Sequence, residues 1–197
     1  MKELLIATRN NGKVREIKEL LKDFDLKITS LDDYPAMPSI EEDGKTFAAN
    51  AVKKAVTIAL YTKKLTLGED SGLEVKFLKN QPGVRSARFA GDCATDQENN
   101  AKLLRLLRGV PLPKRQARYR CFAALADGNK IVDVVNGSCS GLIALAAKGK
   151  NGFGYDPLFL LPRYQKTFGE LASRIKSQIS HRAHALGKIK KSLLKYL

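Results

Sequence analysis

Tryptophan is absent from this sequence of 197 residues, and histidine and cysteine are scarce, with two and three residues respectively. The cysteines are odd in number and never stand in C-x-x-C spacing, which argues against a disulfide framework and against a cysteine zinc site. No apolar run approaches the roughly 20 residues that a membrane-spanning helix requires. The N-terminal segment is too short and too acidic for a secretory signal. We therefore expect a cytoplasmic protein with reduced thiols and no membrane association.

Three common catalytic motifs are also missing. The phosphate-binding pattern G-x-x-x-x-G-K-[ST] does not occur, and neither does the G-x-S-x-G turn that carries a serine nucleophile. His181 and His184 are three residues apart in an expected helix, but no H-E-x-x-H motif is present and no acid is placed as a third ligand. These absences disfavour a Walker-type loop, a nucleophilic triad and a zinc enzyme.

Negative charge is in short supply, because 35 lysines and arginines face 20 aspartates and glutamates, for a net charge of +15. Much of the excess lies near the C-terminus, where lysines alternate with leucine and isoleucine at helical spacing. We interpret this segment as an amphipathic closing helix with a solvated basic face. The alternative is an α/β protein that binds nucleic acid. The lack of tryptophan and of any recognised nucleic-acid module argues against that alternative.

The order of apolar segments predicts an α/β fold in a single domain over residues 1–197. The predicted strands are 2–8, 26–29, 65–67, 73–78, 117–126, 130–135, 138–146 and 158–161. The predicted helices are 13–21, 46–61, 96–107 and a segment from 170 to the end that is broken near Ser180. Asp127-Gly128-Asn129 is a hairpin signal between two of these strands.

The first turn of the chain joins a strand to a helix. It runs from Thr8 to Lys13 and contains Asn10 and Gly12. Helix N-termini present free N–H groups and a partial positive charge, so they are suited to phosphate groups. Lys13 adds a full charge, and the loop is a candidate triphosphate site.

Acidic residues gather at two places that could serve a metal. Glu69 and Asp70 are adjacent between apolar segments, and strand alternation predicts that they point to opposite sides. One could bind Mg²⁺ or deprotonate water while the other supports it. Mg²⁺ prefers oxygen ligands and shares them with substrate phosphates and water. Glu41 and Glu42 lie in a loop that could reach the same ion, and Lys54 on the next helix could meet a phosphate.

A glycine-rich loop near the C-terminus carries Phe153, Gly154, Tyr155 and Asp156. Aromatic faces stack on bases for roughly 1–3 kcal/mol each without base preference, so nearby polar groups must supply selectivity. Asp156, His181 and Arg182 are the candidates for that task. Core packing is the competing interpretation of Phe153 and Tyr155.

Taken together, six segments resemble the inosine triphosphate pyrophosphatase family, the house-cleaning purine nucleoside triphosphatases. They occur in the family's order and cover nearly the whole chain. The segments are Thr8-x-Asn10-x-x-Lys13, Gly44-x-Thr46-Phe47-x-x-Asn50-Ala51-x-x-Lys54-Ala55, Asp70-Ser71-Gly72-Leu73, Pro82-Gly83-x-x-Ser86-Ala87-Arg88-Phe89, Gly152-Phe153-Gly154-Tyr155-Asp156-Pro157 and Ser180-His181-Arg182-x-x-Ala185-Leu186.

The resemblance implies a long mixed central sheet flanked by helices, with two lobes around a nucleotide-binding cleft. It also implies a homodimer and Mg²⁺-dependent hydrolysis of dITP, ITP and XTP to the monophosphate and pyrophosphate. A nucleotide-binding regulator without catalysis is the alternative, although the presence of Asp70 and Lys13 argues against it.

Residue roles follow from the same resemblance. Catalytic roles are implied for Asp70 as proton acceptor, with Lys13, Lys54 and the adjacent Glu69. Metal binding is implied for Asp70 and for either Glu41 or Glu42. Substrate contacts are implied for Thr8, Arg9, Asn10, Asn11, Gly12, Lys13, Ser71, Phe153, Gly154, Tyr155, Asp156, Lys176, His181 and Arg182. Glu69 departs from the aspartate that many relatives carry, so its side chain is one methylene longer.

Overall fold

The computed structural model describes residues 2–37 and 40–196, and it divides the chain into two compact units. Unit 1 comprises residues 1–70, 121–137 and 181–197, and unit 2 comprises residues 71–120 and 138–180. The chain therefore passes between the units four times. Among the described helices, none is both long enough and apolar enough to cross a bilayer.

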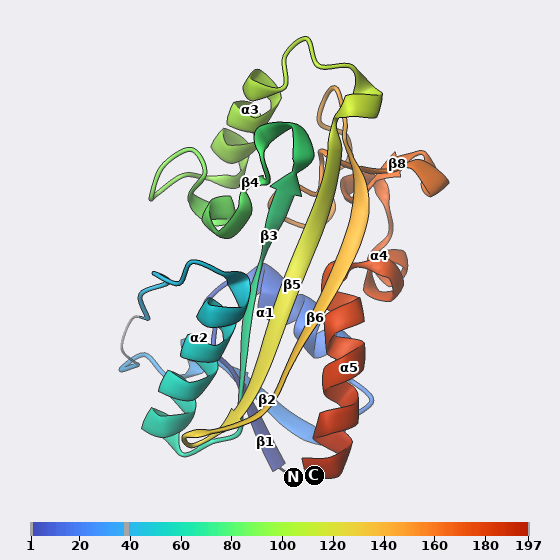
Figure 1. Cartoon of the computed structure of the whole chain (residues 1–197). Helices are drawn as coiled ribbons and strands as arrows, with labels where there is room; N and C mark the ends of the chain where they lie inside the picture. The colour runs from blue at the N-terminus through green and yellow to red at the C-terminus, as the bar shows by residue number, and fades with distance from the viewer. Residues whose placement is uncertain (1, 38–39, 197) are drawn as a thin grey trace. The chain divides into compact units, whose positions relative to one another are not determined.

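The described residues form a mixed α/β structure (Figure 1). Its strands are β1 (Lys2–Ile6), β2 (Leu26–Ser30), β3 (Thr66–Val75), β4 (Gln81–Pro82), β5 (Gln116–Asp127), β6 (Lys130–Ile143), β7 (Phe159–Leu161) and β8 (Lys166–Thr167). Its α-helices are α1 (Asn11–Leu20), α2 (Phe47–Thr62), α3 (Asp96–Leu106), α4 (Ser173–Ile179) and α5 (His181–Tyr196). The strands pair in the order β2-β1-β3-β5-β6-β7-β8, with β4 attached to β3. The predicted α/β class with a mixed sheet is confirmed.

Strand alternation assigns each face of the sheet in unit 1 to its own helices. Leu4 and Ile6 of β1 pack with α1 and α5, in a cluster that also holds Cys121, Ala123 and Leu125 of β5. The intervening Leu5 and Ala7 pack with Ile58 of α2 instead. Successive side chains of a strand point to opposite faces, so α2 covers one face and α1 with α5 covers the other.

Two glycines let helices approach the sheet closely in unit 1. A Cβ atom on Gly68 of β3 would lie 2.2 Å from the carbonyl oxygen of Ala51 and 2.6 Å from the nitrogen of Ala55 on α2. A Cβ atom on Gly137 of β6 would lie 2.3 Å from the carbonyl oxygen of His181 at the start of α5. Both helices therefore rest on strand backbone, which fixes the height of their side chains above the sheet.

Unit 2 has its own core. Leu73 and Val75 of β3 pack there with Leu103 of α3 and with Leu107, which follows the helix. Three aromatic rings, those of Tyr119, Phe159 and Phe168, pack against one another within the same cluster, with centroids 4.7 to 6.1 Å apart. Separations of this size are typical of favourable aromatic pairs.

Two predicted boundaries are wrong, and both involve glycine. The sequence predicts a break at residues 68–72, but β3 runs without interruption from Thr66 to Val75. The sequence also predicts two strands at 130–135 and 138–146, whereas β6 is one strand from Lys130 to Ile143. Glycine weakens strand propensity, yet here Gly68 and Gly137 are the positions at which helix backbone lies against the strand. The predicted helix break at Ser180 is confirmed, because α4 ends at Ile179 and α5 begins at His181.

Candidate active site

The adjacent acids of β3 belong to two separate clusters of unit 1. Glu69 and Asp70 are both buried. Asp70 contacts residues of α2, whereas Glu69 contacts Lys13 near the start of α1 and Arg182 near the start of α5. The predicted divergence of the two side chains is therefore present, and it follows from the alternation of the strand.

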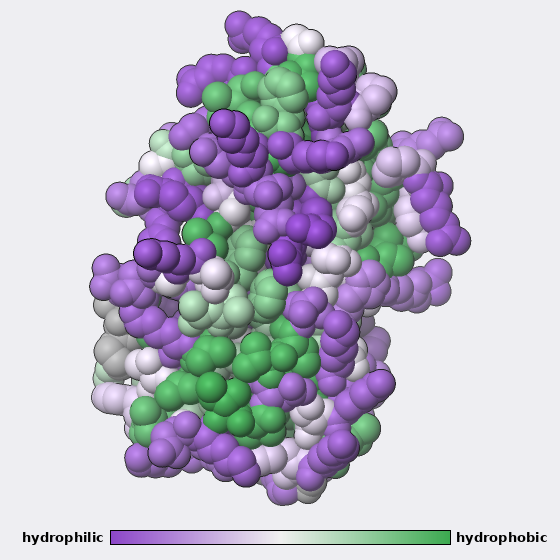
Figure 2. Space-filling view, viewed as in Figure 1, coloured by the Kyte–Doolittle hydropathy of each residue, from purple (hydrophilic) through white to green (hydrophobic). Residues whose placement is uncertain are grey.

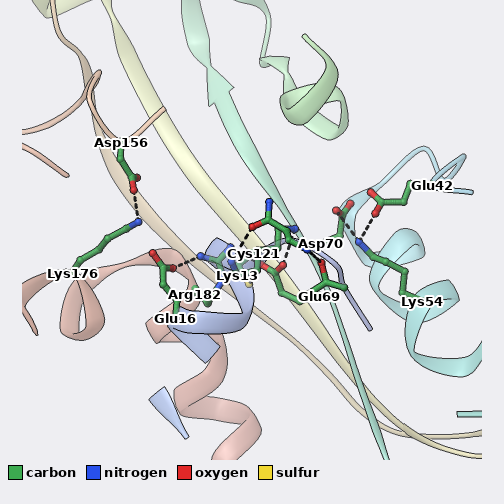
Figure 3. Close-up of polar contacts among 12 residues, drawn as sticks. Lys13, Glu16, Glu42, Lys54, Glu69, Asp70, Cys121, Asp156, Lys176 and Arg182 are labelled. Carbon is green, nitrogen blue, oxygen red and sulfur yellow. Dashed lines mark hydrogen bonds and ion pairs between the residues drawn. The ribbon is translucent and has the colours of Figure 1, made fainter. Parts of the chain in front are cut away.

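Lys54 of α2 joins two carboxylates (Figure 3). Its Nζ donates to Oε1 of Glu42 at 2.9 Å and to Oδ1 of Asp70 at 3.3 Å. The side-chain nitrogen of Asn50 donates to the other oxygen of Asp70 at 3.0 Å. Burial raises the pKa of Asp70, and the nearby Lys54 and Lys13 oppose that rise without cancelling it. A carboxylate with a raised pKa is a better proton acceptor than an exposed one.

Asp70 and Glu42 form an oxygen donor set that suits a hard cation. Both approach the same ammonium group, so the structure already places a positive charge between them. Mg²⁺ is held by one or two carboxylates together with phosphate oxygens and water. In the described part of the chain no group of three or more His, Cys, Asp and Glu side chains could hold a metal. Two carboxylates match a Mg²⁺ ion that arrives with a phosphate substrate, and they do not match a structural zinc site.

Glu69 is the centre of the second cluster. Its Oε2 lies 2.8 Å from Nζ of Lys13, and its Oε1 accepts from Nη2 of Arg182 at 3.0 Å and from Sγ of Cys121 at 3.2 Å. Burial would raise the pKa of Glu69, but Arg182 and Lys13 outweigh burial and hold the pKa well below its usual range. Burial and the adjacent carboxylate raise the pKa of Cys121 well above its usual range. Glu69 is thus a buried anion, and the thiol keeps its proton.

Side chains of the loop before α1 accept hydrogen bonds from the backbone of the loop and of the helix start. The Asn10 side chain caps the helix by accepting from the backbone nitrogen of Lys13 at 3.0 Å, and the Thr8 hydroxyl accepts from the nitrogen of Asn10 at 3.2 Å. An Asn cap of this kind is favourable and fixes the helix start. Arg9 is directed elsewhere, since its Nη1 donates to the carbonyl oxygen of Leu31 at 3.1 Å.

Unit 2 holds the aromatic loop. Asp156 is buried; one of its oxygens accepts from Nζ of Lys176 and from the nitrogen of Phe153 at 3.0 Å. The Lys176 ammonium lies 5.1 Å from the centroid of the Phe153 ring, within cation–π range. Phe153 is partly exposed and Asp156 is not. The pair Asp156–Lys176 therefore supports a ring that can meet a ligand.

Other contacts fix the same loop from α3 and from the core. The backbone nitrogen of Gly154 donates to Oδ2 of Asp96 at 2.6 Å, and its carbonyl oxygen accepts from Asn100 at 2.9 Å. Tyr155 belongs to the core of unit 2, where its hydroxyl donates to the carbonyl oxygen of Ser86 at 2.8 Å. Of the two aromatic residues, Tyr155 thus has the packing role that the sequence left open.

The structure brings most of the predicted residues into these clusters. Unit 1 gathers Lys13, Glu42, Lys54, Glu69, Asp70 and Arg182, and unit 2 gathers Phe153, Gly154, Tyr155, Asp156 and Lys176. His181 is buried at the first turn of α5 in unit 1. Glu41 and Asn11 are exposed, and Gly12 and Ser71 are partly exposed. Of the two candidate metal glutamates, Glu42 is the one that shares a partner with Asp70.

Arg182 has a different environment from the one that a base-reading role suggests. Its side chain is 1% exposed and its two terminal nitrogens donate to Glu16 and Glu69 (Figure 3). The sequence analysis did not single out Glu16 or Cys121, and it did not predict the hydrogen bond from Asn50 to Asp70. Glu16 follows Lys13 by three positions on α1, and that spacing was the available signal, because residues three apart share a helix face.

Comparison with known proteins identifies the family of the chain. The Ham1 family profile matches residues 4–192. The chain belongs to the Ham1 family. It is 52% identical over 186 residues to a dITP/XTP pyrophosphatase of Desulforamulus reducens, covering 94% of this chain and 92% of that protein. It is 49% identical over 189 residues to the enzyme of the same name from Geobacillus kaustophilus, covering 96% and 93%.

Solved Ham1 structures share the fold. A HAM1 protein from Coxiella burnetii matches with a TM-score of 0.88 at 38% identity, over 99% of this chain and all of that one. The Ham1 protein of Staphylococcus aureus matches with a TM-score of 0.86 at 35% identity, over the full length of both chains. The Ham1 fold therefore extends over the whole chain.

Proposed function

We propose that this protein is a dITP/XTP pyrophosphatase that also acts on ITP and uses Mg²⁺. It would release the nucleoside monophosphate and pyrophosphate, and so remove deaminated purine nucleotides from the precursor pool. The observation that carries the proposal is the buried Lys54 held between Asp70 and Glu42. Relatives at 49 to 52% identity that carry the name dITP/XTP pyrophosphatase support it.

Two cationic side chains of unit 1 are suited to a triphosphate. The Lys54 and Lys13 ammonium groups are each paired with a carboxylate, and both lie near Asp70. The N-terminus of α1 adds N–H groups and a favourable dipole. Together they would spread the negative charge of the substrate over fixed positive groups, which is the main source of catalysis in phosphoryl transfer.

Asp70 and Glu42 would hold the Mg²⁺ ion. When bound, the ion would supply positive charge that neutralises phosphate oxygens and makes the phosphorus more electrophilic. Asp70 would orient a water molecule and accept its proton as the water oxygen bonds to the α-phosphorus. The bond from the α-phosphorus to the bridging oxygen then breaks, and pyrophosphate leaves. Asn50 keeps Asp70 in place by its hydrogen bond to Oδ2.

For base recognition, unit 2 offers the Phe153 ring, and unit 1 offers side-chain donors near the start of α5. Phe153 offers a partly exposed ring supported by Lys176. Hypoxanthine and xanthine present a carbonyl at C6, whereas adenine presents an amino group. The His181 side chain would donate to the carbonyl oxygen of such a base, whereas the amino group of adenine would face it with a second donor, and buried mismatches of this kind give large selectivity.

The homodimer also remains a proposal. Figure 2 shows an apolar area over α2 and the adjoining parts of β5 and β6. On these elements Val52, Val56 and Phe122 are partly buried, and Leu60, Ile131 and Val134 are 40 to 46% exposed. An exposed apolar patch of this kind on a protein rich in charge is typical of an interface, and a second copy of the chain is the occupant that the family resemblance implies.

We place the protein in the cytoplasm, in keeping with its three free cysteines.

The test is release of pyrophosphate from dITP, XTP, dGTP and dATP, with Mg²⁺ and with a chelator. We expect metal-dependent turnover of dITP and XTP far above that of dGTP and dATP. Asp70→Asn should lower turnover by roughly 10²–10⁴-fold, the usual cost of losing a general base, while its circular dichroism spectrum stays normal. No turnover of any nucleotide would contradict the enzyme. Salt-dependent binding to DNA or RNA would then favour the nucleic-acid alternative, and nucleotide binding without turnover would favour the regulator.

A further inference from the structure

One buried thiol contacts the charged site, and no step described above uses it. Cys121 of β5 is fully buried, and its Sγ lies 3.2 Å from Oε1 of Glu69. The other two cysteines have different surroundings, because Cys93 is exposed and Cys139 packs against the apolar core of unit 2.

Cys121 can only donate to Glu69. The carboxylate is ionised because Arg182 and Lys13 both face it, so it has no proton to give. A sulfhydryl is a weak donor in water, but a bond to an ionised acceptor in a buried site is stronger. The direction of the hydrogen bond is therefore from the thiol to Oε1.

The same oxygen also accepts from Arg182, while the second oxygen of Glu69 meets Lys13. Glu69 has one more rotatable bond than an aspartate, so its carboxylate needs more fixed partners to stay in one orientation. The charged groups of Lys13 and Arg182 are carried by long, flexible side chains, so these two partners do not by themselves fix the carboxylate. Cys121 differs because its short side chain projects from β5, a strand whose Ala123 and Leu125 pack in the same cluster.

We propose that Cys121 is a positioning residue for the reaction, because its thiol orients the Glu69 carboxylate and thereby holds Lys13 and Arg182 in place. The inference rests on the proposed function. Without the thiol, Oε1 keeps a single donor and the carboxylate can turn. The Lys13 ammonium then follows its partner away from the position in which it meets phosphate.

Two variants test the role directly. Cys121→Val fills similar space without a donor, and Cys121→Ser keeps a donor. We expect Cys121→Val to lower kcat for dITP about tenfold, the cost of one hydrogen bond to a charged group, with KM changed less than about threefold on the same scale. Cys121→Ser should recover kcat to within about threefold of wild type. Cys139→Val, which removes a thiol from the core of unit 2, is the matched control and should leave kcat unchanged.

A double-mutant cycle separates positioning from packing. Glu69→Asp removes one methylene and one rotatable bond, so the shorter carboxylate needs fewer hydrogen-bond partners to keep its orientation. If Cys121 acts through Glu69, adding Cys121→Val to Glu69→Asp should cost no further activity, whereas a packing defect would cost the same in both backgrounds. The proposal is overturned by an equal loss in both backgrounds, by wild-type kcat in Cys121→Val, or by a Cys121→Ser variant that is folded and as slow as Cys121→Val.

A second readout needs no turnover. Acetic anhydride acylates the neutral amine of a lysine side chain and releases acetate, so a lysine held in an ion pair reacts slowly, and mass spectrometry reports the rate at each lysine. We expect Lys13 to react several times faster in Cys121→Val than in wild type or in Cys139→Val, with the exposed Lys22 as an internal reference. Unchanged Lys13 reactivity would contradict the positioning role even if the wild-type protein hydrolysed no nucleotide, and a faster reaction would support that role in the same case.

Discussion

At the scale of single residues, charge in unit 1 is divided between two sides of one strand. Asp70 meets Lys54 on one side, and Glu69 meets Lys13 and Arg182 on the other. Each buried anion thus has a cation of its own, which burial of charge requires. Asp70 has a raised pKa and Glu69 a lowered one, so adjacent carboxylates differ in proton affinity.

The two loop glutamates provide a prediction with a built-in control. Glu42 shares Lys54 with Asp70, whereas Glu41 is exposed. We expect Glu42→Gln to raise the Mg²⁺ concentration needed for half-maximal activity by at least about tenfold, in the range seen when metal sites lose supporting groups. Glu41→Gln should change it by less than about twofold on that scale. Titration of activity with Mg²⁺ measures both, and the reverse result would assign the metal to Glu41.

A second residue prediction concerns acid stability. Burial opposes ionisation of Glu3, but hydrogen bonds from Lys64, Tyr34 and Thr29 outweigh it and lower the pKa of Glu3 to about 2. A carboxylate whose pKa is lower in the folded than in the unfolded state stabilises the fold at pH values above its unfolded-state pKa. That stabilisation is lost as the pH falls toward the folded-state pKa. Glu3→Gln should therefore lose less stability than wild type between about pH 5 and pH 3.

Urea unfolding midpoints at those two pH values provide the measurement. Asp25→Asn, at an exposed carboxylate, serves as the control and should follow wild type. Identical pH dependence in Glu3→Gln and wild type would show that this ion pair makes no contribution to acid sensitivity.

At the scale of elements, glycine contacts set the position of the active-site helices. α2 carries both Lys54 and Asn50, and it lies on β3 at Gly68. A side chain at Gly68 would have to displace helix backbone rather than a flexible side chain. The height of α2 over β3 therefore decides whether Lys54 and Asn50 reach Asp70.

We expect Gly68→Ala to destabilise the protein by about 1–3 kcal/mol, as overpacking usually does, and to lower kcat in the fraction that remains folded. Gly187 of α5 is the matched control because a Cβ atom there meets nothing within 4 Å. Gly187→Ala should stabilise by about 0.5–1 kcal/mol through helix propensity. Chemical denaturation compares the two, and equal effects would contradict the close contact at Gly68.

At the scale of the whole molecule, the net charge of +15 opposes association of two copies, whereas the apolar area over α2, β5 and β6 favours it. Like-charged copies repel one another at a distance, so a dimer of this chain depends on apolar contact and should tighten as salt screens the repulsion.

We expect Ile131→Lys combined with Val134→Lys to produce a monomer, because both side chains are apolar and at least two-fifths exposed on β6, and a lysine buried without a partner in an interface is costly. Light scattering coupled to size exclusion reports the mass. A wild-type protein that is already monomeric at micromolar concentration would contradict the proposed dimer, and a double variant that still dimerises would contradict this area as its interface.

Much of this molecule could be predicted from the sequence, and the failures have a physical pattern. Helices with caps and apolar periodicity, such as α2 after Thr46, were predicted to within about two residues. Strands interrupted by glycine were not, because Gly68 and Gly137 have local signals for a break and tertiary reasons for continuity. The opposite directions of Glu69 and Asp70 followed from alternation alone.

The partners of the charged groups were harder to predict. Arg182 meets Glu16 across 166 residues of sequence, and Cys121 meets Glu69 across 52. Local patterns contain no information on such pairings, since they depend on which strands and helices become neighbours. The family resemblance named Arg182, Lys176, Glu69 and Asp156, but it named neither their pairing nor Glu16.

The division of unit 1 among three stretches of sequence bears on how the protein is made. Its core includes Leu186, Ile189 and Leu193 of α5, which a ribosome translates after every other described element. Arg182, the partner of Glu69, comes equally late. A nascent chain can thus complete the core of unit 2, which ends at residue 180, before unit 1 can close. A message truncated before α5 would yield a chain with an open apolar face and no complete charge cluster, a suitable target for quality-control proteases.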